Sequence, residues 1–192
     1  MKIIDIIKQS ADLLGLSQEV EILNNTTVET EASALENEDI RSLFNLSKYA
    51  IQEMCTNYVP MVTRLAIETK EKRFELGKLP NFIRINKVLK NEENVLFKII
   101  NRCLFVEENG TYEIEYLTYP EIISLFDEID FLATFSPDLI VFALSSYYTL
   151  SHGRFDEFEI FHEQYISKAE SIKELKTFSM PQRRWEWKIK RL

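Results

Sequence analysis

The stretch that decides the fold is Phe82–Pro120, which has the sequence FIRINKVLKNEENVLFKIINRCLFVEENGTYEIEYLTYP. Near its end, over Tyr112–Tyr116, apolar residues alternate with two glutamates, so one face of the segment is apolar and the other is charged. Alternation with a period of two residues is typical of a β-strand with one buried face. The stretch therefore predicts β-structure in a chain whose other segments have mostly helical patterns.

Short polar segments divide this stretch into separate strands. Lys90–Asn94 precedes the apolar run Val95–Ile100, and Asn101-Arg102 forms a second break. Asn109-Gly110 lies directly before the alternating segment, and it suits a tight hairpin turn because both residues tolerate positive φ. The sequence predicts a meander of three or four antiparallel strands at about residues 82–118, set between two helical blocks.

Helical periodicity precedes the predicted sheet. The first helix is expected to end at Gly15, and Ser17 is a candidate N-cap for a short second helix. The polar, acidic segment Asn25–Glu36 has no periodicity, which predicts a loop or linker. The clearest helix spans about residues 37–59, because its apolar residues recur at spacings of three, four and seven. Met61–Phe74 then favours an extended segment that joins the sheet.

Further helices follow the predicted sheet. Glu121–Phe131 indicates a short helix or helical turn, and Leu139–Ser151 indicates a helix that is apolar on most sides and therefore buried. We expect Gly153 to end that helix. A last long helix follows over about residues 154–176, and we expect it to pack against the helix at 37–59.

Composition favours a single globular domain with a sizeable core, because the chain has 192 residues, of which 45% are apolar and 28% charged. The predicted fold class is α+β: a mainly α-helical bundle over residues 1–180 with an inserted antiparallel β meander, followed by an extended C-terminal arm at 181–192. Cys55 and Cys103 fit a reducing compartment and define no disulfide framework. Neither a signal peptide nor a membrane-spanning run is visible. We therefore expect a soluble protein made in the cytoplasm, without membrane association.

Sequence motifs for nucleotide binding, nucleophilic catalysis and metalloprotease chemistry are absent. A small metal-dependent enzyme could use His152 and His162 with nearby carboxylates. We favour surface or packing histidines, because no Cys or acidic ligand pattern accompanies this pair. Solvated helix faces are likewise favoured over acid–base pairs for two carboxylate clusters. These clusters are Asp127, Glu128 and Asp130, and Asp156, Glu157 and Glu159. We predict no enzymatic activity, no metal and no cofactor.

The C-terminal tail differs in composition from the rest of the chain. Residues 183–192 hold five basic residues against one acid, a net charge of +4, whereas the whole chain carries −8 and the remainder therefore −12. Pro181 prevents a helix from continuing, and past Arg184 apolar residues alternate with charged ones, which favours an extended arm. The candidate partner-binding residues are Arg183, Arg184, Trp185, Trp187 and Ile189.

Three interpretations of this arm stay open at the level of sequence. The arm could fold back on its own domain and cover a groove, or it could dock on another subunit by strand addition or aromatic anchoring. It could also bind nucleic acid through its mixture of basic and aromatic residues. The charge of −12 on the rest of the chain argues against a dedicated nucleic-acid role, so we favour docking on another subunit.

Five motifs occur together in the order typical of one protein family. They are Asn57-Tyr58-Val59-Pro60, Ile85–Lys90, Asn109–Tyr116 before Pro120, His152–Glu157 and Pro181–Trp185. Over about residues 37–185 the chain resembles the head–tail connector (adaptor) proteins of tailed bacteriophages that infect Firmicutes. The acidic segment 25–36 and the final residues WKIKRL depart from that pattern.

The resemblance implies a helical bundle with a β extension that assembles as a homo-oligomeric ring, usually a dodecamer, beneath the portal protein. Such a ring lies in the neck of the virion, bridges the portal and the tail or nozzle proteins, and needs no cofactor. DNA passes through its channel without specific binding, and an acidic ring suits that passage because like charges repel. Two alternatives are a tail-completion or neck ring protein, and a cytoplasmic protein-interaction domain with no virion role.

Deleting residues 181–192 should leave the monomer folded but weaken its binding to the ring or the portal. Trp185→Ala and Trp187→Ala together should cause most of that loss, because a large aromatic at a hot spot is worth on the order of 2 kcal/mol. Circular dichroism and sedimentation measure the two effects separately. A truncated chain that unfolds would place the arm in its own core, and one that assembles normally would make the arm dispensable.

Overall fold

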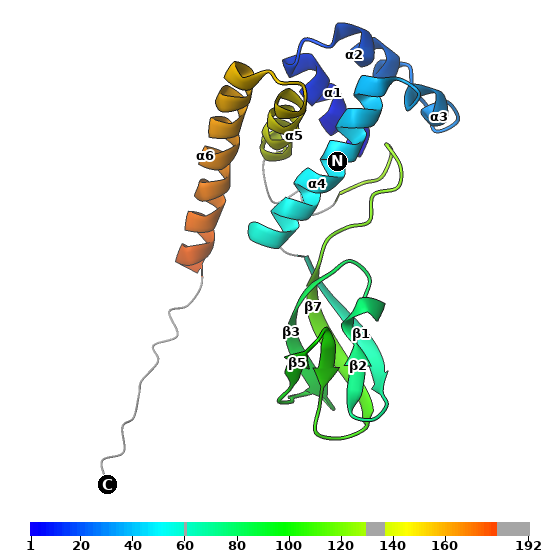
Figure 1. Ribbon diagram of the computed structural model, residues 1–192, viewed down its shortest axis with the longest axis vertical. Helices are drawn as coiled ribbons and strands as arrows, with labels where there is room; N and C mark the ends of the chain where they lie inside the picture. Colours follow the sequence, from blue (N-terminus) through cyan, green and yellow to red (C-terminus); the bar gives the residue numbers. More distant parts are fainter. Residues whose placement is uncertain (60, 130–136, 180–192) are drawn as a thin grey trace.

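The computed structural model describes residues 1–59, 61–129 and 137–179, and its side chains are described up to residue 172. The chain combines α-helices with antiparallel sheets, which confirms the mixed helical and β character predicted from sequence. The helices lie together at one end of the molecule, and the strands form a β module that stands out from them (Figure 1). The β module comprises residues 61–118, so it includes the segment 61–74 that the sequence expected to join the sheet as well as the predicted meander at about 82–118.

The N-terminal helices follow the predicted pattern with one correction. Helix α1 spans Ile3–Leu13, and Gly15 reverses the chain after it with a φ of +74°. Helix α2 spans Ser17–Asn24, so Ser17 is its first residue, and the N-cap is Leu16, which makes no side-chain capping bond. The predicted capping by Ser17 is therefore wrong.

The acidic segment Asn25–Glu36 contains a short helix, so its prediction as only a loop or linker is wrong. Helix α3 spans Glu31–Ala34. The carboxylate of Glu31 accepts hydrogen bonds from Ser124 Oγ at 2.8 Å and from the Leu125 N–H at 2.6 Å. This contact joins segments more than ninety residues apart in the chain, and local periodicity could not reveal it.

The segment after the sheet forms no helix over residues 121–129, so of the helix or helical turn predicted for 121–131 only a single turn is present, in which the Asp127 N–H donates to the Ser124 carbonyl at 3.2 Å. The Asp127 carboxylate accepts the N–H groups of Ile123 and Ser124 at 2.7 and 2.8 Å. Carbonyl groups of the same segment accept the Ile3 N–H and the Ile4 N–H of α1 at 3.0 and 2.7 Å. Because these carbonyls serve the first turn of α1, the segment stays irregular.

Helix α4 (Glu38–Asn57) confirms the clearest helix of the sequence. Asn37 is its N-cap, and the side-chain oxygen of Asn37 accepts the N–H groups of Asp39 and Ile40, both at 3.0 Å. Such a cap satisfies two amides that have no partner within the helix. The buried face of α4 consists of Ile40, Leu43, Phe44, Ser47, Ala50, Ile51, Met54 and Cys55.

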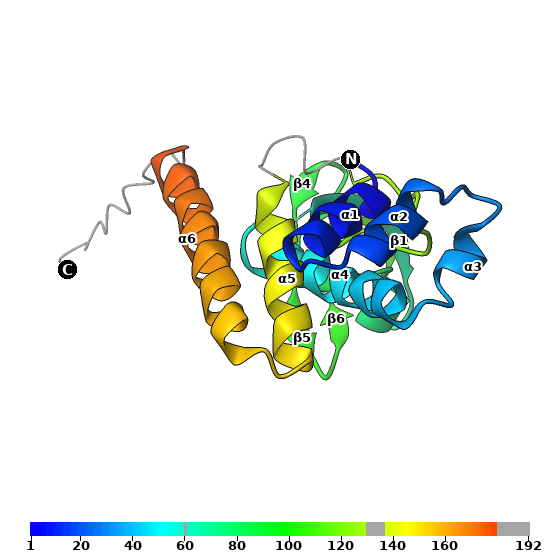
Figure 2. The same cartoon turned by 90° about the horizontal axis from the view of Figure 1, so that it is seen from above.

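The C-terminal helices are α5 (Asp138–Ser151) and α6 (Phe155–Ser179). Helix α5 is buried on most sides, as predicted, and Gly153 ends it with a φ of +70°. Helix α6 packs on α5, which lies between α6 and α4 (Figure 2). The expected direct packing of α4 on α6 is therefore wrong in the main, although the Tyr58 and Tyr165 rings meet edge to face with centroids 6.2 Å apart.

Two antiparallel sheets replace the single meander that the sequence predicted. The four-stranded sheet has the order β1 (Met61–Thr69), β7 (Gly110–Thr118), β3 (Phe82–Lys90) and β4 (Glu93–Asn94). The three-stranded sheet has the order β2 (Arg73–Glu75), β6 (Cys103–Phe105) and β5 (Lys98–Ile100), and a 3₁₀ turn, η1, spans Leu76–Lys78. The expected extended segment at residues 61–74 is confirmed as β1 and β2.

Two hairpins are closed by tight turns with positive φ at two successive residues, Asn91-Glu92 between β3 and β4 and Asn101-Arg102 between β5 and β6. A third turn of this kind, Glu71-Lys72, connects β1 to β2 of the other sheet through the isolated bridge between Lys70 and Arg73. The two breaks predicted around 90–94 and 101–102 are thus confirmed. The predicted hairpin at Asn109-Gly110 is wrong, because β6 and β7 belong to different sheets. Asn109 instead accepts the Lys72 N–H at 2.6 Å, and Gly110 begins β7 with a φ of +150°.

The hydrophobic side chains form two clusters, one in the helices and one in the β module. The helical cluster includes residues of α1, α2, α4, α5 and α6, together with Leu125 and Ile129 from the irregular segment. The β cluster contains Ile67, Leu76, Leu79, Val88, Leu104, Val106, Tyr112, Ile114 and Tyr116. The alternation in β7 is therefore confirmed: its apolar residues are buried and its glutamates face the other side.

Ile114→Ala should lower the free energy of unfolding by about 2–5 kcal/mol, because Ile114 is fully buried at the centre of the β cluster. Chemical denaturation followed by circular dichroism measures the loss. Ile123→Ala is the matched control, since this side chain is 72% exposed and its removal should cost less than about 0.5 kcal/mol. Equal losses in the two variants would contradict the assignment of the β core.

Candidate functional site

The partner-binding residues predicted from sequence lie outside the residues that the structure describes. These residues are Arg183, Arg184, Trp185, Trp187 and Ile189, and the whole predicted arm at 181–192 lies there as well. Their role stays a prediction. The site is therefore built from the surfaces that the described residues present.

The two candidate histidines occupy separate places on different helices. His152 lies at the end of α5, stacks on Tyr148 with ring centroids 4.0 Å apart, and places Nε2 3.9 Å from Asp39 Oδ1. His162 lies on α6 and stacks on Phe158 with centroids 5.0 Å apart. Within residues 1–59, 61–129 and 137–179, no three His, Cys, Asp or Glu side chains form a group suited to hold a metal ion.

The cysteines and several of the candidate carboxylates are buried or take part in turns and ion pairs. Cys55 and Cys103 are both buried free thiols, and burial raises the pKa of Cys55 to about 12, which keeps the thiol protonated at neutral pH. Asp127 closes the turn described above, and Glu157 in the first turn of α6 pairs with Arg154, which directly precedes this helix. Asp130 lies outside the described residues. These positions favour roles in packing and turns over acid–base chemistry.

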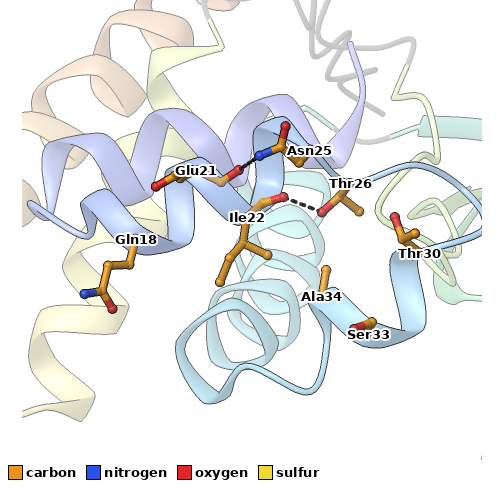
Figure 3. Close-up of a pocket in the computed structure, with 8 residues that line it drawn as sticks. All are labelled: Gln18, Glu21, Ile22, Asn25, Thr26, Thr30, Ser33 and Ala34. Atoms are coloured by element: carbon orange, nitrogen blue, oxygen red, sulfur yellow. Dashed lines mark hydrogen bonds between the residues drawn. The ribbon is translucent and has the colours of Figure 1, made fainter.

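A cleft lies between α2 and α3, and we call it the α2–α3 cleft (Figure 3). Its volume is about 560 Å³, within the range of roughly 300–1,000 Å³ in which protein pockets hold a small organic group. Ile22 projects from α2 into this space, and its side chain is 38% exposed. The lining residues are Gln18, Glu21, Ile22, Asn25, Thr26, Thr30, Ser33 and Ala34.

Local hydrogen bonds hold the walls of the α2–α3 cleft. Asn25 donates its side-chain amide to the Glu21 carbonyl at 3.0 Å, and Thr26 Oγ1 donates to the Ile22 carbonyl at 2.8 Å. These bonds satisfy the last carbonyls of α2. On the other wall, Glu31 fixes α3 to the irregular segment at residues 122–127. Each wall of the cleft is therefore held by its own hydrogen bonds, the α2 wall by Asn25 and Thr26 and the α3 wall by Glu31.

The region around the cleft has a strongly one-sided charge. No Lys or Arg occurs between Lys8 and Arg41, whereas this interval holds eight acidic residues. Glu21, Glu29 and Glu36 are exposed, and no ion pair among the described residues includes them. Among the residues that line the α2–α3 cleft, Glu21 carries the charge, so the cleft itself presents one exposed carboxylate without an ion pair among the described residues. The interval was visible in the sequence, but without α3 it predicted no cleft.

A second surface is the exposed edge of the three-stranded sheet, which we call the β5 edge and define as residues 96–100. Leu96 is 83% exposed, and Ile99 and Ile100 are about half exposed. Strand β5 pairs only with β6 among the described strands, so its outer side offers backbone groups without a strand partner. A hollow of about 420 Å³ lies beside it, lined by Leu96, Phe97, Lys98, Phe105, Val106 and Glu107.

Sequence reasoning missed the β5 edge because Val95–Ile100 has the composition of a buried strand. Exposure here depends on pairing: β5 lies at the edge of its sheet, and each of its three residues is exposed. Periodicity assigns a strand but does not say whether another strand or helix covers it. The two isoleucines at 99 and 100 were visible, but their exposure was not.

The solvent-facing side of the four-stranded sheet carries a charged cluster centred on Glu115. This glutamate is only 5% exposed, and it accepts hydrogen bonds from Arg64 Nε at 3.0 Å and from Asn86. Lys87 lies 3.9 Å away. Burial alone would raise the pKa of Glu115, but the hydrogen bonds from Asn86 and Arg64 and the charge of Lys87 together outweigh it, so the pKa is lowered. The cluster joins β1, β7 and β3 across the sheet.

Comparisons with known proteins do not place the chain in a family: no protein-family model matches it, and no curated protein matches it either. Within the described part of the chain, no helix combines the length and the apolar composition needed to cross a membrane.

Glu115→Gln should make the stability of the β module less dependent on pH. A carboxylate whose pKa is lowered by folding stabilises the fold above its ordinary pKa of about 4.5, and that stabilisation is lost as pH falls through the lowered value. The variant should therefore be less stable than the natural chain at pH 7, and the difference should vanish in strong acid.

Urea denaturation at a series of pH values between neutral and strongly acidic measures this difference. Glu113→Gln is the matched control on the same strand, because Glu113 is 45% exposed and has a single ion-pair contact with Arg64 at 3.4 Å. Its removal should change the pH dependence much less. If the two variants behaved alike, the cluster would not depend on Glu115.

Proposed function

We propose that this protein is a head–tail connector (adaptor) of a tailed bacteriophage. In this proposal, a helical bundle with a β extension assembles into a homo-oligomeric ring, a dodecamer, in the neck of the virion. The ring binds the portal protein on one side and a tail or nozzle protein on the other. DNA passes through it without specific binding, and the protein has no catalytic function and no cofactor.

The observation that carries this proposal is the β5 edge. Leu96, just before β5, and Ile99 and Ile100 on β5 gather three exposed apolar side chains within five residues at one edge of the β module. Apolar side chains gathered along an edge strand are typical of a surface that another protein covers. A β module that stands out from the helices is also what the resemblance to connector proteins implies (Figure 1).

Charge supports the same proposal. The chain without its last ten residues carries −12, and much of that charge lies in the helices around the α2–α3 cleft. A ring built from such subunits has a strongly acidic surface, which repels the phosphate backbone of DNA. Repulsion suits a passage through which DNA has to move freely.

If the gene neighbourhood of this chain encodes a portal protein, co-expression with that portal protein tests the proposal. The expected result is a complex in which negative-stain microscopy shows a ring on the portal and native mass spectrometry gives the copy number. Genes for capsid and tail proteins on both sides would support it further. A chain that stays monomeric and does not bind the portal would overturn the proposal and favour a protein-interaction domain with no virion role.

Leu96→Asp should leave the fold and the ring intact but abolish binding of the tail-side partner. The side chain is 83% exposed, so the charge costs little in the free subunit and is buried only when a partner covers the β5 edge. Leu150→Asp is the control, since Leu150 lies at the end of α5 and is 45% exposed. Co-purification with the tail-side neighbour measures both variants, and loss of binding in both or in neither would refute this role of the β5 edge.

A further inference from the structure

We propose that the α2–α3 cleft receives the C-terminal residues 181–192 of a neighbouring copy of this chain. This inference rests on the proposed ring and names one contact that closes it. The neighbour's tryptophans would fill the cleft, and its basic residues would face the acidic rim. The cleft is formed by residues that the structure describes, whereas the properties of the segment 181–192 are taken from its sequence.

The chemistry of the cleft matches a segment that is both basic and aromatic. Ile22 and Ala34 give it apolar walls, while Gln18, Thr30 and Ser33 offer polar atoms between them. With a volume of about 560 Å³, it has room for a large side chain such as an indole. Tryptophan suits such a place because it combines a large apolar body with one N–H donor.

The charges of the cleft region and of the C-terminal segment are complementary. Eight acidic residues and no basic residue lie between Lys8 and Arg41, and residues 183–192 carry +4. Glu21 on the cleft wall and the nearby Glu29 and Glu36 make no ion pair among the described residues. By contrast, the β module is nearly neutral, with ten basic against nine acidic residues over 61–118. Electrostatic attraction therefore favours the cleft over the β5 edge as the docking place of the arm.

The arrangement of the helices favours a neighbouring copy over the same chain. Figures 1 and 2 both place α6 and α3 on opposite flanks of the helical region, with α5, α1 and α4 between them. The described chain ends at Ser179 on the α6 flank. To reach its own cleft, the arm would have to pass around the intervening helices. The cleft of a subunit placed beside α6 needs no such detour.

A head-to-tail contact between copies requires the donating segment and the receiving cleft to lie on opposite flanks of the subunit, as they do here. When one flank donates a segment and the other receives it, each copy does both, and repetition of the contact closes a ring if the rotation between copies allows it. The contact is heterologous, so it does not stop at a dimer. The arm and the cleft thus form one interface repeated around the ring.

Tryptophan fluorescence of the full-length chain tests this proposal directly. Both tryptophans of the chain, Trp185 and Trp187, lie in the segment, so the emission reports on it alone. We expect a blue shift that appears as the protein concentration rises and weakens at high salt. In Glu21→Lys, the concentration at the midpoint of this shift should rise about tenfold or more. Glu68→Lys, an exposed acid on β1, is the matched control and should behave like the natural chain.

Charge reversal on both sides provides a second measurement. Glu21→Lys combined with Arg183→Glu and Arg184→Glu should restore part of the lost blue shift, which a merely misfolded variant would not do. A blue shift independent of concentration would mean that the arm docks on its own chain, and a shift equal in Glu21→Lys and Glu68→Lys would place it elsewhere; either result overturns the proposal. A shift that appears only when the portal is added overturns it as well.

The proposed ring and the proposed cleft contact fail in different ways. Sedimentation with the portal reports on ring assembly, whereas fluorescence reports on the arm. A ring that assembles on the portal without any blue shift leaves the connector function standing and refutes the cleft contact. A chain that forms no ring refutes the connector function, and with it the neighbour as occupant.

Discussion

The pairing of β7 with β1 on one side and β3 on the other is the interaction on which the β module depends. Because side chains of a strand alternate between two faces, β7 directs Tyr112, Ile114 and Tyr116 into the β core and Glu115 to the outer side. A shift of register by one residue would turn the tyrosines away from the β core and the glutamates into it, so the pattern fixes the pairing. The Glu115 cluster then supports the same register from the outside, since its partners come from both neighbouring strands.

The helical region depends on contacts between distant segments in a different way. The carbonyls of residues 125 and 127 accept the first amides of α1, and Glu31 of α3 binds the same segment from the other side. An irregular segment thus connects two helical ends that the chain separates by about thirty residues. The α2–α3 cleft is a consequence, because α3 has only four residues and would not stay helical without these bonds.

Local patterns predicted the elements that are stable for local reasons. Periodicity of three and four residues found α4, an apolar composition on most sides found α5, and the alternation in β7 found the central strand together with its buried face. Three of the errors share one cause: helix α3, the irregular segment at 121–129 and the division into two sheets all depend on partners far away in the sequence. Asn109-Gly110 illustrates this, since it has the composition of a hairpin turn but connects strands of different sheets. The candidate surfaces also depend on distant contacts that local patterns do not reveal. The acidic interval was visible, whereas the cleft within it and the exposure of Leu96 depend on tertiary packing.

The resemblance to connector proteins, on which the proposed function rests, does not include the acidic segment at residues 25–36 or the final residues WKIKRL. If the two formed one interface, a gain of acid on the receiving flank would accompany a gain of base on the donating arm, as complementary interfaces require. Two separate departures would then have one physical cause. The same pairing would limit self-repulsion between acidic subunits, because every contact around the ring would neutralise part of the charge of its neighbour. An acidic ring could therefore keep a surface that repels DNA while its subunits still attract each other.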